Sequence, residues 1–135
     1  MSVIDTTSEF TVNIDGQRTG TNYRGLFKVK KYLSHADFLL KERIYLDMLG
    51  PYAEKAGVAA SNTAEMMSTC HVRILEAPIW WKEAGNGMSL VDEEPPLEIY
   101  QKIKKIDEDL LAAVRKKGQE ARDDLLAMSP PPTAG

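Results

Sequence analysis

The stretch that decides the fold is FTVNIDGQRTGTNYRGLFKV, residues 10–29. Apolar and polar side chains alternate on both sides of the Asp15-Gly16 pair, which is the pattern of two half-buried strands. Because an Asp-Gly pair opens a tight turn, the two runs predict a β-hairpin. Gly25 lies inside the second run and indicates either a bulge or a close approach of another segment. An isolated hairpin is marginal in water, so we expect the rest of the chain to cover its apolar face.

The segment after the hairpin has helix signals at both ends. Ser34 and Asp37 form a capping-box pattern, and Gly50-Pro51 stops the helix. Apolar residues, with Phe38 and Tyr45 among them, cover more of this helix than one-sided packing needs, so we expect a second contact surface. A second helix is expected to begin near Asn62, after an alanine-rich connection, and to stop before Pro78.

Prolines and glycines are frequent in residues 78–96, which predicts a long loop. Trp80 and Trp81, the only tryptophans, lie at its start. Adjacent side chains on an extended segment point to opposite sides, so we expect one ring to enter the core. The other ring would be presented to a partner together with Ile79 and Leu90, because tryptophan is frequent at interface hot spots. Two purely structural rings, or a platform for a ligand, are the alternatives.

Residues 97–128 predict one long helix of about 48 Å. Its apolar residues, including Ile103 and Leu110, recur every three or four positions between charged flanks, close to a coiled-coil seam. Gly118 weakens this stripe, so the helix is expected to break or leave the body there.

These elements predict one α+β domain, mainly helical, with an N-terminal β-hairpin packed on two or three helices; its 135 residues suit a single domain. The expected segments are a polar arm at 1–9, a hairpin and two-helix body at 10–96, the long helix at 97–128 and a proline-rich tail at 129–135.

The composition of the chain argues against some classes of partner. The net charge is −3, which argues against a broad nucleic-acid surface; a weak contact through Lys28, Lys30 and Lys31 is the remaining option. No run approaches the roughly 18 apolar residues of a membrane span, and the N-terminus lacks a secretory pattern. A single cysteine cannot form an internal disulfide. We therefore expect synthesis in the cytosol and no membrane contact.

No catalytic motif stands out, and we expect neither enzyme activity nor a metal or cofactor. Cys70 and His71 are neighbours on a predicted helix, where they point about 100° apart and do not form a nucleophile–base pair. Carboxylates are clustered at 92–94 and 107–109. We expect these side chains to be solvated and to complement the helix dipole rather than to act in acid–base catalysis. The rival hypothesis is a small enzyme or ligand-binding module that uses the 78–96 loop as a lid over the tryptophans.

Three stretches together resemble a known group: TNYRGLFKVKKYLSHADFLLKERIYLDMLG, EAPIWWKEAGNGMSLVDEE and the charged C-terminal helix. This order is similar to that of small proteins of tailed bacteriophages, especially tail assembly chaperones encoded near the tape-measure protein. The resemblance implies a non-enzymatic protein that acts in virion assembly in the host cytoplasm, or a minor head or tail component that stays in the virion. Its partners would be tape-measure, tail-tube or capsid subunits, and further copies of itself. The side chains expected to contact partners are Trp80, Trp81, Ile79, Leu90, Phe38, Tyr45, Ile103 and Leu110.

Overall fold

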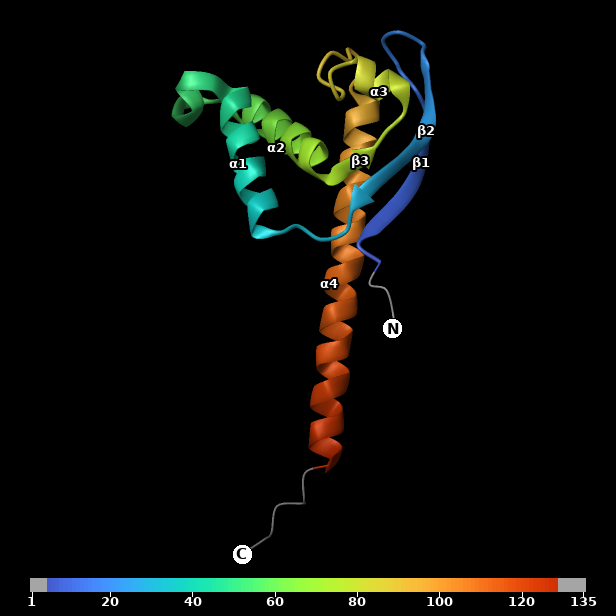
Figure 1. Ribbon diagram of the computed structural model, residues 1–135, viewed down its shortest axis with the longest axis vertical. Coiled ribbons are helices and arrows are strands. Elements are labelled where there is room, and N and C mark those ends of the chain that lie inside the picture. Colours follow the sequence, from blue (N-terminus) through green and yellow to red (C-terminus); the bar gives the residue numbers. More distant parts are fainter. Residues whose placement is uncertain (1–4, 129–135) are drawn as a thin grey trace, which may run out of the picture. The chain divides into compact units, whose positions relative to one another are not determined.

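The computed structural model describes residues 5–128. Its elements in chain order are β1 (Thr7–Asp15), β2 (Asn22–Lys30), α1 (His35–Leu49), the 3-10 helix η1 (Gly50–Lys55), α2 (Val58–Arg73), β3 (Ile74–Glu76), α3 (Ile79–Glu83) and α4 (Glu94–Met128) (Figure 1). The fold is α+β and mainly helical, as predicted, with an antiparallel sheet of order β1-β2-β3. The chain divides into two compact units, and the boundary between Lys104 and Lys105 falls within α4. The predicted tail at 129–135 lies outside the described residues.

The hairpin forms as its alternation predicts. Phe10 is paired with Phe27 and Ile14 with Tyr23, so the apolar side chains of β1 and β2 share one face. The turn is closed by the amide of Gly16, which donates to the Thr21 carbonyl at 2.8 Å. The β1–β2 register runs unbroken past Gly25. This glycine instead marks a close approach, because a Cβ there would lie 2.2 Å from Cγ of Pro78. β1 begins inside the predicted polar arm.

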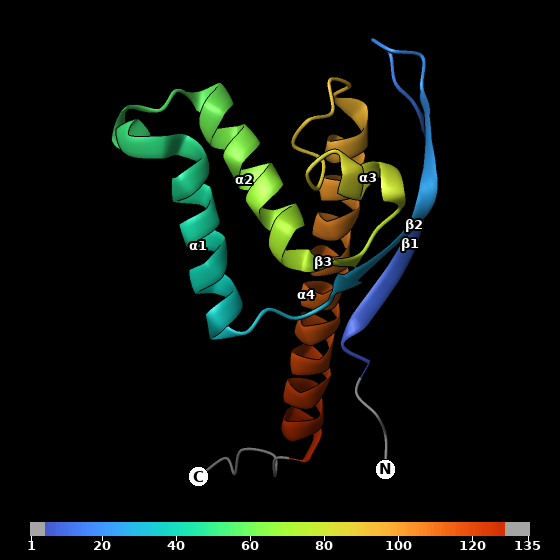
Figure 2. The same cartoon turned by 45° about the horizontal axis from the view of Figure 1, so that its top comes forward.

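Capping fixes the start of α1. The Ser34 hydroxyl accepts from the Asp37 amide at 3.1 Å, and the Asp37 carboxylate accepts from the Ser34 amide at 2.9 Å, so the predicted capping box is confirmed. α2 starts at Val58, before the predicted start near Asn62. Alanines favour helix strongly, and they extend α2 into the expected connection. α1 and α2 lie side by side in both views (Figure 2).

Two short elements were not predicted. β3 follows α2 directly and pairs with β2 through Val29 and Ile74. The Nε atom of Arg73 donates to the Lys30 carbonyl at 2.9 Å and fastens the end of β2 beside it. The predicted 78–96 loop contains α3, which begins after Pro78 and carries both tryptophans. The tryptophans therefore lie on a helical turn, and the premise of an extended segment was wrong.

The first unit holds the core. Its fully buried apolar side chains come from the hairpin, α2, α3 and the first turns of α4, and they are Phe27, Val29, Cys70, Trp81, Pro95, Ile99 and Ile103. α4 starts at Glu94, and its first turn accommodates two prolines, as proline geometry allows. The helix runs through Gly118 without a break, so of the two outcomes expected at this residue the break does not occur. Between Lys105 and Met128 no side chain is buried.

Candidate protein-binding site

Asp92 fastens the loop before α4 to the tip of the hairpin. Its carboxylate, which is 1% exposed, accepts from the amides of Arg18 at 2.8 Å and Thr19 at 3.1 Å, and from the Tyr23 hydroxyl at 2.6 Å. Gly16 leaves the necessary space, because a Cβ there would lie 2.2 Å from Oδ2 of Asp92. Hydrogen bonds from the side chains of Thr19 and Tyr23 lower the pKa of Asp92 to about 2. The same contact raises the pKa of Tyr23.

The two tryptophans pack on the hairpin. Trp81 is 1% exposed and meets Phe27 edge-on, with ring centroids 5.7 Å apart. Trp80 is half-buried, and its indole N–H donates to the Arg24 carbonyl at 2.8 Å. Its ring also meets Tyr23 edge-on at 5.1 Å. Trp81 is therefore a core residue in this structure and not an accessible partner contact.

The other side chains predicted to bind partners range from fully buried to exposed. Ile103 is fully buried, so its expected role as a partner contact is corrected: it packs in the core of the first unit. Ile79 and Phe38 are exposed. Three more are half-buried, namely Tyr45, Leu90 and Leu110.

Helix α1 has no buried side chain at all. Its half-buried positions include Lys41, Ile44, Tyr45 and Met48. Lys41 forms a 2.5 Å ion pair with Glu65 of α2. This spacing is that of one helix face, which lies toward α2. The remaining apolar side chains of α1 face solvent: Phe38 at 57%, Leu39 at 71%, Leu40 at 44% and Leu46 at 45%. We call these four residues the α1 face.

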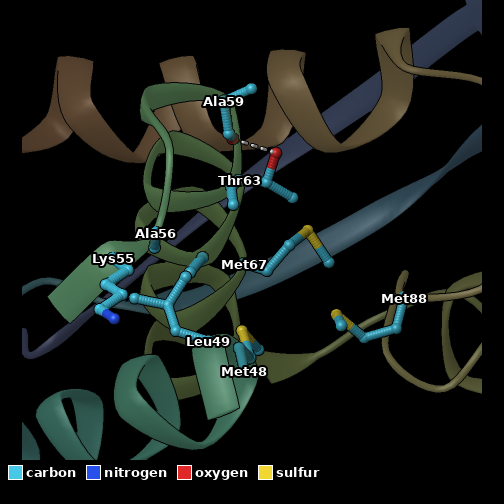
Figure 3. Close-up of a pocket in the computed structure, with 10 residues that line it drawn as sticks. Met48, Leu49, Lys55, Ala56, Ala59, Thr63, Met67 and Met88 are labelled. Atoms are coloured by element: carbon cyan, nitrogen blue, oxygen red, sulfur yellow. Dashed lines mark hydrogen bonds between the residues drawn. The ribbon is translucent and has the colours of Figure 1, made fainter. Parts of the chain in front are cut away.

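A groove of about 520 Å³ opens between the end of α1, helix α2 and the loop after α3. Figure 3 shows Met48, Met67 and Met88 reaching toward it from these three segments. Alanines line its α2 side, and the hydroxyl of Thr63 is bonded to the Ala59 carbonyl at 2.9 Å rather than offered to a ligand. The lining is Met48, Leu49, Lys55, Ala56, Ala59, Ala60, Thr63, Ala64, Met67 and Met88.

A second hollow of about 470 Å³ shares part of this lining, including Met67 and Met88, and adds Met66, Leu90 and Leu97. Thioether side chains are flexible and polarizable, so a methionine-rich groove adapts to apolar side chains of different shapes. Small alanines let a helix approach closely. We call the two hollows together the methionine groove.

The reactive side chains in this region are poorly placed for chemistry. Burial raises the pKa of the Cys70 thiol to about 12, and it lowers the pKa of His71. Both residues line a cavity of only about 60 Å³ beside Trp81, which has room for about two water molecules. Within residues 5–128, no three His, Cys, Asp or Glu side chains are grouped so that they could hold a metal ion.

The short basic patch is partly neutralised. Lys30 lies 2.9 Å from Asp37, and Lys31 lies 3.3 Å from Asp5. Lys28 is opposite Glu76 in the sheet register. These pairings reduce the positive field that a phosphate backbone would need.

Sequence reasoning missed the methionine groove and the Asp92 contact. Met66 and Met67 are neighbours on one helix, but Met88 comes from a loop 21 positions after Met67, and no local pattern joins it to them. The only local signal for Asp92 was its place just before a proline-rich helix start, which also fits a simple dipole role.

None of the helices in residues 5–128 combines the length and apolarity that crossing a bilayer requires. Comparison of the chain with known protein families, with curated protein sequences and with solved structures gives no significant match.

Proposed function

We propose that this protein is a non-catalytic assembly protein that binds other proteins through the α1 face and the adjoining methionine groove. The observation that carries the proposal is α1 itself: a helix of 15 residues in which no side chain is buried. Four large apolar side chains of this helix are exposed, and exposed apolar surface beyond scattered single residues marks protein-binding sites on many proteins.

The energetics support binding. Burying a fully exposed leucine or phenylalanine side chain contributes about 1.5–3 kcal/mol. Leu39 and Phe38 are largely exposed, so covering both offsets a substantial part of the entropy lost on association. The methionine groove, which α1 borders through Met48 and Leu49 at its C-terminal end, suits an amphipathic helix, whose apolar side chains methionines can accommodate.

The sequence resemblance supplies the biological setting of the proposal. The chain would act in the assembly of a tailed bacteriophage, either as a tail assembly chaperone or as a minor head or tail component. Its partners would be tape-measure, tail-tube or capsid subunits. Mass spectrometry of purified virions separates the two roles, because a chaperone is absent from the finished particle and a structural component is present.

A binding assay with one substitution tests the surface. Leu39→Lys places a charge in the α1 face without touching the core. It should weaken binding of tape-measure, tail-tube or capsid subunits at least tenfold while leaving the melting temperature unchanged. The matched control is Leu26→Lys on the outer face of β2, where the exposed fraction is 48%. Failure of every candidate subunit to bind, or equal effects of the two variants, would count against the proposal.

A further inference from the structure

The second unit of the chain has an apolar stripe of its own along α4. Leu111, Val114, Gly118, Ala121, Leu125 and Met128 follow one another at alternating spacings of three and four residues. That spacing keeps them on one helix face and is typical of a seam between two helices. Leu111, Val114 and Met128 are 50%, 66% and 80% exposed.

Charged residues flank this stripe in a definite order. With about 100° between successive residues, Lys117 and Asp124 lie along one edge of the stripe. Arg115 and Arg122 lie along the other edge. The opposite, outer side of the helix carries Lys116 and also Asp123, which accepts from the Gln119 side chain at 2.9 Å.

We propose that a second copy of this chain covers the stripe, and that the two helices pair antiparallel over residues 111–128. In this register Gly118 lies opposite Ala121 of the second copy, and Val114 lies opposite Leu125 of the second copy. Leu111 then meets Met128 of the second copy at each end. The small side chains fall at the centre, where they let the two backbones approach closely.

Charge decides the orientation. In antiparallel helix pairs, equivalent edges face each other, so Lys117 meets Asp124 of the second copy, and symmetry makes this contact twice. In a parallel pair, opposite edges meet, and Lys117 would face Arg122 of the second copy. The antiparallel pair sets Arg115 against Arg122 on its other edge. That repulsion makes the association reversible rather than permanent.

Sedimentation equilibrium of the full chain tests the proposal, with charge variants at the edge of the stripe. Wild-type protein should show a monomer–dimer equilibrium. Lys117→Glu should raise the dissociation constant about fivefold or more, because it replaces two attractive contacts by two repulsive ones. Adding Asp124→Lys to Lys117→Glu should restore the wild-type value, and Arg115→Glu alone should tighten the dimer. Lys116→Glu on the outer side is the matched control and should change nothing.

Three results would overturn the proposal. One is a chain that remains monomeric up to about 1 mM. Another is a dimer that Lys117→Glu leaves unchanged, which would place the interface elsewhere. The third is a dimer that Lys117→Glu tightens, which is the parallel outcome. The surface differs from the α1 face, so loss of dimerisation leaves the proposed partner binding unaffected, and the two failures are distinguishable.

Cross-linking checks the orientation independently. A mixture of Gly118→Cys and Ala121→Cys chains should form a mixed disulfide under oxidising conditions faster than either variant links to itself. The native Cys70 is buried with a pKa of about 12, so it does not compete. Rapid linking of Gly118→Cys to itself would show a parallel pair instead.

Discussion

The hydroxyl of Tyr23 donates a 2.6 Å hydrogen bond to the Oδ2 atom of Asp92, a residue 69 positions later in the chain. Together with the amides of Arg18 and Thr19, it makes this carboxylate the link between the hairpin and the start of α4. Buried carboxylates that accept several hydrogen bonds are held in the ionised form. Folding of the hairpin and docking of the α4 start are therefore coupled through this buried charge.

Asp92→Asn should lower the melting temperature at neutral pH and flatten its dependence on pH in the acid range. The pKa of Asp92 is about 2 in the folded chain and near 3.9 for an unperturbed aspartate. A depressed pKa contributes stability that is fully present above about pH 4 and is lost as the pH falls through about 2. Thermal unfolding followed by circular dichroism, repeated at a series of pH values from about 2 to neutrality, measures the effect.

The neighbouring carboxylate provides the control for Asp92. Glu93 pairs with Arg18 at 3.2 Å, but its side chain is 80% exposed. Surface ion pairs of this kind contribute little to stability. Glu93→Gln should therefore behave like wild type, and a pH profile of Asp92→Asn that runs parallel to wild type would contradict the role of Asp92.

Elements fixed by neighbouring residues were predictable from the sequence. The hairpin follows from alternation and one Asp-Gly turn, and α1 follows from Ser34 and Asp37 at its start. The surplus of apolar residues on α1 was also visible, and the structure leaves four of them exposed. In each case the decisive signals, a short alternating run, a turn pair and a capping pair, lie within a few neighbouring residues, which is the range where pattern and capping are informative.

Elements fixed by distant residues were not predictable. β3 is only three residues long, and it forms because it pairs with the edge of β2. The helical turn of α3 places Trp81 against Phe27, and no local signal marked which of two adjacent tryptophans would be buried. The methionine groove likewise needs three segments to meet. Tertiary context overrides local propensity in such short elements.

Gly87→Ala should destabilise the fold more than Gly85→Ala. Both glycines have positive φ, 88° and 62°, so both alanines cost about 1–2 kcal/mol of backbone strain. Only at Gly87 would the new Cβ meet another group, because Cη2 of Trp81 would lie 2.4 Å away. Overpacking adds about 1–3 kcal/mol. Urea unfolding of the two variants measures the difference, and equal losses would show that the ring moves aside freely.

Trp81→Ala should cost more stability than Trp80→Ala. Removing the buried ring of Trp81 leaves a cavity in the core and should cost about 3–5 kcal/mol. Trp80 is half-buried, and its loss removes edge contacts and one hydrogen bond to the Arg24 carbonyl. We expect about 1–3 kcal/mol for Trp80→Ala, measured by chemical unfolding followed by circular dichroism. The reverse order would contradict the assignment of Trp81 as the core ring.

Cys70 should be inert to thiol reagents in the native protein. Its side chain is fully buried, and a pKa raised to about 12 by burial keeps the thiol protonated at pH 7. Labelling must then wait for local opening, so a chromogenic disulfide reagent should react far more slowly with folded protein than with protein in denaturant.

Gly87→Ala should speed the labelling of Cys70. Cys70 and Trp81 line the same small cavity, and the new Cβ would displace the Trp81 ring. Gly85→Ala, which meets no neighbouring atom, should accelerate labelling less. Native protein that labels as fast as denatured protein would show that the core around Cys70 opens freely.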